Sequence, residues 1–93
     1  MIQKTMLKNI EVRLEIFQEG NFYVALCPDL DVSSFGETLE EAKQSVQEAL
    51  EAFFEECEIM GTLSIVLEEA GFMQQNGNWL PRQPIFSELV TIG

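Results

Sequence analysis

Carboxylates are the side chains of this sequence that could do chemistry, because its 93 residues include no histidine. Without histidine the Ser-His and Cys-His pairings are excluded, so Ser33 and Ser34 have no base to activate them. Asp29, Asp31 and Glu37 form an acidic cluster outside the predicted helices. Their oxygens could bind a divalent cation. No glycine-centred calcium loop surrounds them, however, so the sequence favours a hydrated loop in which Asp29 or Asp31 caps a turn.

A second group of carboxylates lies at helical spacing in the middle of the chain. Glu51, Glu55 and Glu58, with Glu56 beside them, could hold a metal ion at three- and four-residue steps. No histidine accompanies them, so a hydrated helix face is the favoured interpretation. Neither G-x-G-x-x-G nor G-x-x-x-x-G-K-[ST] occurs, which leaves nucleotide binding unsupported. We therefore expect no catalytic residue, no metal site and no cofactor.

Three other side chains could serve function or packing. Cys27 and Cys57 are thirty positions apart without a CxxC motif. This is typical of reduced cysteines in the core of a cytoplasmic protein. Trp79 could be an exposed binding anchor, but a chain this short favours a place over the second predicted helix. Residues 1–5 do not open an export signal, and no apolar run reaches the roughly 20 residues that span a bilayer.

The chain is strongly acidic. It has five basic and 16 acidic residues, a formal net charge of −11. Because nucleic-acid affinity depends on Lys and Arg that neutralise phosphates, we expect no direct contact with nucleic acid, and no binding to anionic membranes. The charge can simply keep a small protein soluble, or it can steer the protein towards a basic protein partner.

Apolar periodicity predicts the elements that position these residues. Alternation over residues 9–17 predicts a strand, and a Gly20-containing turn over 18–21 joins it to a second strand over 22–27. Pro28 ends the second strand, and residues 29–35 supply a turn and a short third strand. In the first strand we expect Ile10, Val12, Leu14 and Ile16 to face the core and Glu11, Arg13 and Glu15 to face outwards.

A long helix follows, and it opens with a capping box. Thr38 can accept a hydrogen bond from the N–H of Glu41, whose carboxylate can reach back to the N–H of Thr38. Apolar residues then recur at three- and four-residue steps to a helix end near Gly61. The opposite side is acidic. The residues that we expect to bind a partner there are Glu40, Glu48, Glu51 and Glu55.

The last third of the chain predicts a small lobe and a final strand. Residues 62–70 suit a short helix ended by Gly71, and Asn76-Gly77 suits a type I′ hairpin turn. Residues 85–92 are apolar enough for a final strand at an edge of the first sheet.

These elements predict one α+β domain over residues 1–93. Residues 1–60 form a β-β-β-α core, in which the long helix packs on one face of an antiparallel sheet. Residues 62–84 form a helix-and-hairpin insertion before the final strand.

The first sixty positions resemble the signature of the HicB-like antitoxin domain. That signature has an aromatic-Tyr pair in a strand, Pro-Asp-Leu at the strand end, and Gly-x-Thr-x-x-Glu-Ala at the opening of a long helix. The likeness covers about residues 9–60 and depends on order and spacing. Its matching positions are Tyr23, Pro28, Leu30, Gly36, Thr38, Glu41 and Ala42.

The resemblance implies a β-β-β-α-β module similar to a partial ribonuclease H fold without the catalytic carboxylates. Such proteins are the antitoxins of type II toxin–antitoxin systems. They bind and mask HicA, a small basic mRNA interferase with a catalytic histidine, and they form homodimers or larger homo-oligomers. The acidity of the present chain fits such a basic partner.

Two departures from the family pattern support a second interpretation. Asp31-Val32-Ser33 stands where the family has Pro-Gly-Cys, and residues 62–93 hold no helix-turn-helix or ribbon-helix-helix. We therefore do not expect the chain to repress an operon. The alternative is a free-standing HicB-like oligomeric scaffold, or a module that binds a small ligand or a protein without a toxin partner.

Overall fold

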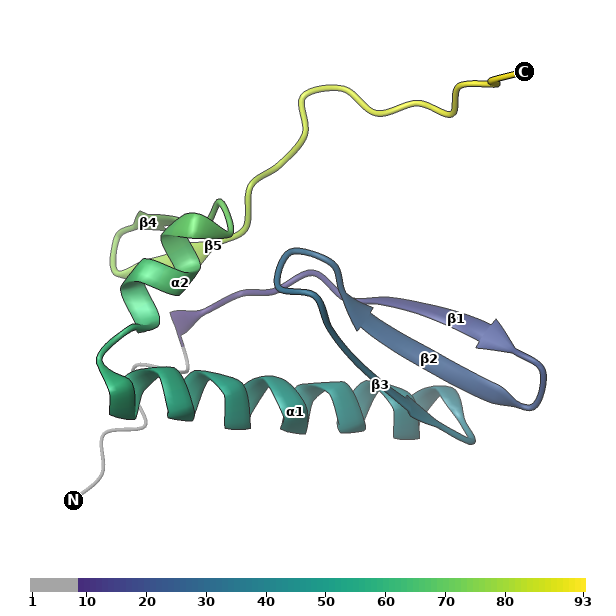
Figure 1. Cartoon of the computed structure of the whole chain (residues 1–93), viewed down its shortest axis with the longest axis horizontal. Coiled ribbons are helices and arrows are strands. Elements are labelled where there is room, and N and C mark those ends of the chain that lie inside the picture. Colours follow the sequence, from purple (N-terminus) through teal and green to yellow (C-terminus); the bar gives the residue numbers. More distant parts are fainter. Residues whose placement is uncertain (1–8) are drawn as a thin grey trace.

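The structure, a computed structural model, describes residues 9–93, so the expectation about an export signal in residues 1–5 lies outside the described residues. The fold is α+β, as predicted, with a three-stranded antiparallel sheet, a long helix, a short helix and a two-stranded hairpin (Figure 1). The elements are β1 (Glu15–Glu19), β2 (Phe22–Cys27), β3 (Val32–Gly36), α1 (Leu39–Met60), α2 (Leu63–Glu69), β4 (Met73–Gln75) and β5 (Asn78–Leu80).

The first hairpin has a shorter loop than predicted. β1 continues to Glu19, which pairs with Phe22, so the loop is Gly20-Asn21 alone. Gly20 has a φ of 60°, as the first position of a type II′ turn requires. The strand also begins at Glu15 rather than at residue 9, because the residues before it reach the other lobe. There Ile10 forms a parallel bridge with Trp79.

The turn between β2 and β3 follows Pro28, as the sequence predicts. The N–H of Leu30 donates to the carbonyl of Cys27 at 3.2 Å, which closes a turn of four residues. Asp31 then adopts a left-handed φ of 57°, a conformation that aspartate tolerates better than most residues. This turn sets the register in which β3 pairs antiparallel with β2.

The start of α1 is held by the predicted cap, with one correction. Thr38 Oγ1 accepts from the N–H of Glu41 at 3.1 Å, as expected. Glu41 Oε1 accepts from the N–H of Glu37 at 3.0 Å, rather than from Thr38, because the carboxylate reaches one residue further back. At the other end the predicted stop is confirmed, since Gly61 caps the helix with a φ of 72°.

Gly36 allows β3 to approach α1 closely. A Cβ atom on Gly36 would lie 2.6 Å from the backbone N of Ala42 and 2.7 Å from Cβ of Glu41. Those distances are too short for any side chain, so only glycine fits at the junction. Ala42 is itself fully buried there, and Tyr23 pairs with Gly36 across the sheet. Five signature residues therefore share the corner where the sheet meets the helix, namely Tyr23, Gly36, Thr38, Glu41 and Ala42, whereas Pro28 and Leu30 lie in the turn at the other end of β2.

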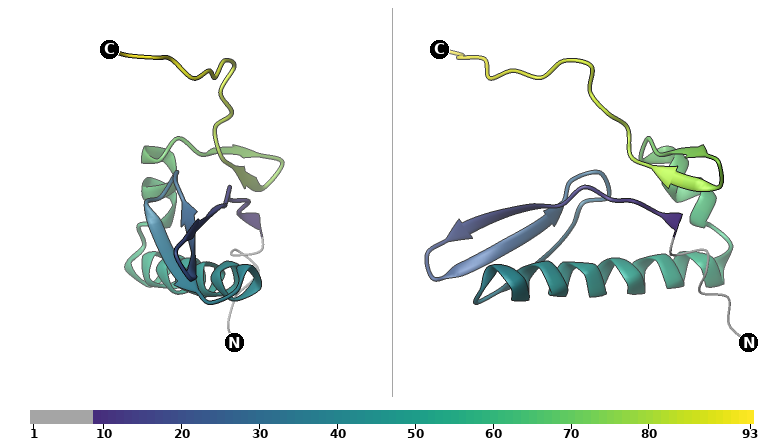
Figure 2. Two further views of the ribbon diagram at one scale, coloured as in Figure 1. Left: turned by 90° about the vertical axis from the view of Figure 1, so that its right-hand side faces the viewer. Right: turned by 180° about the vertical axis from the view of Figure 1, so that it is seen from behind.

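α1 packs against both lobes of the fold (Figures 1 and 2). The sheet lies over the N-terminal half of the helix, and α2 with the β4–β5 hairpin lies over its C-terminal half. One core runs along the buried side of the helix. Its members are Ala25, Cys27, Ala42, Val46, Leu50, Phe54, Cys57, Leu63, Leu67, Phe72 and Trp79.

The smaller lobe follows the sequence prediction closely. Asn76 and Gly77 have φ values of 55° and 83°, and two positive values in a two-residue loop define the predicted type I′ turn. Gly71 follows α2 with a φ of 94°. Trp79 is only 7% exposed, which confirms its place in the core and rules out an exposed anchor.

The predicted final strand over residues 85–92 is wrong. These residues leave β5 as an extended segment that rises away from α1 and pairs with no described strand (Figures 1 and 2). Pro81 and Pro84 have no N–H to donate to a ladder, so pairing beside the N-terminal part of the chain stops after the single Ile10–Trp79 bridge. We call residues 85–92 the C-terminal segment.

Candidate functional site

The outer side of α1 carries three of the four glutamates that were predicted to bind a partner. Glu40, Glu48 and Glu51 are exposed and line one shallow hollow together with Lys43, Gln44 and Gln47. We call these three glutamates the acidic face. Glu55 lies one turn further along, half-buried and outside that hollow. The structure therefore brings Glu40, Glu48 and Glu51 together and leaves Glu55 at the end of the row.

Within α1, Lys43 is the one positive charge that accompanies the acidic face. α1 contains seven glutamates and one lysine, Lys43, and it has no basic residue in its last turn. The amide of Gln44 donates to Glu48 at 3.3 Å, which orders one carboxylate without neutralising it. A solvated row of like charges of this kind attracts a cationic surface over about 8–10 Å, the Debye length at moderate ionic strength.

The three acids that were considered as a cation site do not act together. Asp29 Oδ2 accepts from Arg13 Nη1 at 3.0 Å, and its side chain is 8% exposed. Asp31 and Glu37 are exposed, and Glu37 lies at the far end of β3 from the turn. Within residues 9–93, no group of three potential metal ligands comes together. Asp29 is a structural ion-pair partner and not part of a hydrated loop, which corrects the sequence expectation.

Arg13 is the residue that the sequence interpretation missed. It was expected to face outwards from the first strand, but it is half-buried and tied to two distant parts of the chain. Besides its pair with Asp29, its Nη2 donates to the carbonyl of Arg82 at 2.9 Å. Arg13 therefore joins the β2–β3 turn to the residues that follow β5.

The strand register explains this contact. In the β1–β2 pairing Glu15 lies opposite Leu26, so two residues further back Arg13 lies beside Pro28 and Asp29. The predicted loop over residues 18–21 was two residues too long. The register that it implies therefore does not place Asp29 beside Arg13. A two-residue shift keeps each side chain on its face but changes what lies opposite it.

Both cysteines are in the core, as predicted. Cys27 is 0% and Cys57 6% exposed, and both are free thiols. Burial raises the pKa of the Cys27 thiol above its ordinary value of 9.0, and the nearby charge of Asp29 adds to that rise. Such a thiol is a poor nucleophile at neutral pH because so little of it is thiolate.

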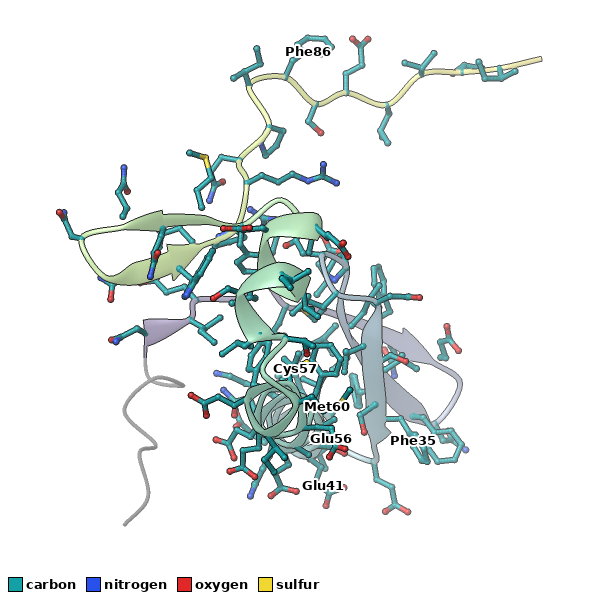
Figure 3. All side chains as sticks on the ribbon, turned by 60° about the vertical axis from the view of Figure 1, so that its left-hand side comes forward. Phe35, Glu41, Glu56, Cys57, Met60 and Phe86 are labelled. Carbon is teal, nitrogen blue, oxygen red and sulfur yellow. The ribbon has the colours of Figure 1, made fainter. Side chains whose placement is uncertain are left out.

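The face of the sheet that points away from α1 has uncovered apolar side chains beside Glu15, Glu19 and Ser33. Phe17, Val24 and Phe35 form a row across β1, β2 and β3. Phe22 packs edge-on against Phe35, with ring centroids 5.9 Å apart. Phe17, Phe22 and Phe35 are 51%, 48% and 65% exposed. We call Phe17, Phe22, Val24 and Phe35 the open sheet face, and Figure 3 shows Phe35 on the side of the sheet remote from the helix.

A second hollow of the described residues offers no comparable site. It lies between the N-terminal approach to β1 and the second hairpin, with a volume of about 610 Å³. It is lined by Glu11, Val12, Arg13, Met73, Gln74, Gln75, Leu80, Pro81, Arg82 and Gln83. The guanidinium of Arg13 is already occupied, and the described residues leave no buried side-chain polar atom unpaired. A small ligand would find few convergent polar groups there.

Comparisons with protein-family models, curated protein sequences and solved structures found no match to this chain. In the described part of the chain, no helix combines the length and apolar character needed to cross a membrane.

Proposed function

We propose that the chain is an antitoxin-like protein of a type II toxin–antitoxin system. It binds a basic mRNA interferase of the HicA type in the cytoplasm and masks its active site. The observation that carries this proposal is the acidic face, a row of exposed carboxylates on the outer side of a helix whose other side is fixed to the core.

The chemistry of an RNA-cleaving partner suits such a face. A ribonuclease binds its substrate through Lys and Arg that neutralise phosphates. Carboxylates held on a rigid helix can occupy the same cationic surface and exclude RNA. Complementary charge of this kind raises the association rate and selects the partner. The chain itself then needs no nucleophile, base or metal.

The signature residues support the same proposal. Gly36 is required by a close approach, and Thr38 and Glu41 hold the helix start. Together they fix the direction in which α1 leaves the sheet, and hence the direction in which the acidic face points. The likeness to HicB-like antitoxins depends on these residues of the chain itself.

An inhibition assay with matched variants tests the proposal. A purified HicA-type ribonuclease is assayed on RNA with the wild-type chain, with Glu48→Lys/Glu51→Lys, and with Glu68→Lys/Glu69→Lys as control. Glu68 and Glu69 are exposed on α2, so the control changes the net charge equally at another surface. We expect wild type and control to inhibit and to rescue growth on co-expression, and the α1 variant to fail. Equal inhibition by all three would contradict the proposal, as would a wild-type chain that inhibits no such enzyme.

The open sheet face supports a second candidate, an oligomeric scaffold without a toxin partner. Three half- to two-thirds-exposed phenylalanines on one sheet face form the kind of apolar patch that marks interaction sites on soluble proteins. A chain that inhibits no HicA-type enzyme and yet self-associates would favour this candidate.

A further inference from the structure

The C-terminal segment is apolar and almost wholly exposed. Ile85, Leu89 and Ile92 are 103%, 100% and 87% exposed, so their side chains pack against almost nothing in the described chain. Apolar surface in contact with water raises the free energy of a chain, which favours any arrangement that covers it. The segment therefore calls for an apolar surface within its reach.

The spacing of the apolar residues in this segment suits a helix better than a strand. In a strand they would be divided between two faces, so one set would remain in water. In a helix, with about 100° per residue, they fall within one arc of about 160°. The apolar arc consists of Ile85, Phe86, Leu89, Val90 and Ile92. The other side of the helix would carry Ser87, Glu88 and Thr91.

Pro84 stands where such a helix would begin. Proline has no N–H to donate, and its fixed φ suits the first position of a helix. It also disfavours the helical conformation at Gln83, which sets the boundary. Eight residues rich in β-branched side chains do not hold a helix in water. The helix would therefore form only against a surface that covers its apolar arc.

The segment starts on the side of the sheet that carries the open sheet face. Leu14 and Ile16 pack towards the core, so Arg13 and Phe17 lie on the opposite side of the same stretch of chain. Arg13 Nη2 holds the carbonyl of Arg82 at 2.9 Å. Arg13 precedes Phe17 by four residues, about 13 Å of extended chain, and the segment begins three residues after Arg82, up to about 10 Å away. The segment can therefore reach the open sheet face of its own chain.

The views of the chain agree with this path. The segment runs along the length of the sheet, on the side remote from α1 (Figures 1 and 2). In Figure 3 it turns towards the side on which Phe35 lies, and Phe86 is clear of the sheet. A change in the backbone between Arg82 and Ile85 can thus lower the segment onto the sheet, while the lobe that holds Arg82 stays fixed.

The dimensions of the two apolar surfaces match. Phe17, Val24 and Phe35 lie across three strands, which span about 10 Å at the usual strand spacing. A helix over residues 85–92 rises about 10 Å from its first residue to its last. A hollow of about 450 Å³ beside Phe22, Val24 and Phe35 leaves room for side chains of the arc.

The charges of the sheet favour a helix that crosses the strands. Glu15 and Glu19 lie on β1 before and after Phe17, on the same face. A helix laid along β1 would cover both carboxylates, which is costly without a partner for each. A helix laid along the row from Phe17 to Phe35 meets apolar side chains, and its polar side with Glu88 faces water.

We propose that residues 85–92 close over the open sheet face of their own chain as a short amphipathic helix. The extended segment is the open state of this lid. In the closed state helices cover both faces of the sheet, α1 on one and the C-terminal segment on the other. Closure hides the phenylalanines that would otherwise support self-association. It uses no residue of the acidic face, so its failure and the failure of toxin binding are separate results.

Nuclear magnetic resonance of the full chain at low concentration tests the closed state. We expect helical Cα shifts over residues 85–92, and amide exchange at least about tenfold slower than in an unstructured peptide of the same sequence. Leu89→Asp, in the middle of the apolar arc, should abolish both signals. Thr91→Asp, on the polar side, is the matched control and should keep them. Extended or unstructured shifts for the wild-type segment would overturn the proposal, as would an equal response to the two substitutions.

A disulfide trap tests which molecule the segment covers. Val24→Cys/Leu89→Cys places one thiol on the sheet face and one on the apolar arc, whereas Val24→Cys/Thr91→Cys moves the second thiol to the polar side. Cys27 and Cys57 are buried, so they do not compete in the folded chain. Under mild oxidation we expect the first pair to close at least about tenfold faster than the second, within one chain of 10.6 kDa. A disulfide between two chains, or equal rates for the two pairs, would contradict closure of the segment on its own sheet.

Discussion

Replacing Gly36 by alanine tests the close approach on which the position of α1 depends. The added Cβ would lie 2.6 Å from the backbone N of Ala42, 2.7 Å from Cβ of Glu41 and 2.8 Å from the carbonyl carbon of Glu41. Two of these three atoms are backbone atoms of the first turn of α1, so relief requires the helix to move from β3. Such overpacking costs typically 1–3 kcal/mol, and we expect the free energy of unfolding to fall by about 2 kcal/mol.

The expected loss of stability is opposite in sign to the usual effect of a Gly→Ala substitution. Gly36 does not have a left-handed φ, and in a compatible backbone Gly→Ala usually stabilises by about 0.4–1 kcal/mol. A loss of about 2 kcal/mol should lower the melting temperature by roughly 8–16 °C in a domain of this size. Urea titration followed by circular dichroism measures it, with Ser33→Ala on the exposed side of the same strand as control. Unchanged or increased stability of Gly36→Ala would refute the close approach.

Three other perturbations test the helix cap and the core. Leu67→Ala, at a position with no exposure, should lower the free energy of unfolding by about 3 kcal/mol in denaturant titration, and a loss below about 1 kcal/mol would contradict its burial. Thr38→Ala should cost about 1 kcal/mol, because the N–H of Glu41 loses its acceptor, and no loss would mean that the cap is not formed. Because burial raises the pKa of Cys27, its contribution to stability is present below the ordinary thiol value of 9.0 and is lost as pH rises towards the folded-state pKa. Native chain should react slowly with a thiol reagent, and rapid modification at neutral pH would contradict the burial of both cysteines.

Local signals predicted the parts of the fold that local physics determines. The capping box, the apolar stripe and Gly61 placed α1, because caps and periodicity act within a few residues of one another. Asn76-Gly77 likewise placed the second hairpin, since few other residue pairs take two positive φ values.

Long-range features were not predictable in the same way. The pair between Arg13 and Asp29 spans sixteen residues and depends on a loop length that the sequence does not fix. The C-terminal segment has strand composition, but composition does not say which edge a strand joins, or on which molecule. The residues of the open sheet face could not be identified from the sequence either, because the row of Phe17, Val24 and Phe35 forms only once three strands are in register.

For the candidate site, the sequence predicted the helix face on which the glutamates lie but not the exposure of each one. Helical spacing alone placed Glu40, Glu48 and Glu51 on one outer side of α1. Glu55 follows the same spacing, but the surroundings of the C-terminal half of the helix leave it half-buried. Sequence spacing gives the face of a helix, whereas exposure depends on what the rest of the chain lays over it.

The most direct test of partner binding through the acidic face is the affinity for a purified HicA-type ribonuclease, measured by calorimetry at several salt concentrations. We expect the affinity to fall as salt rises, and Glu48→Lys/Glu51→Lys to lower it by at least about tenfold, or roughly 1.4 kcal/mol. The Glu68→Lys/Glu69→Lys control should stay close to wild type. Equal affinity of wild type and the α1 variant at every salt concentration would contradict the claim.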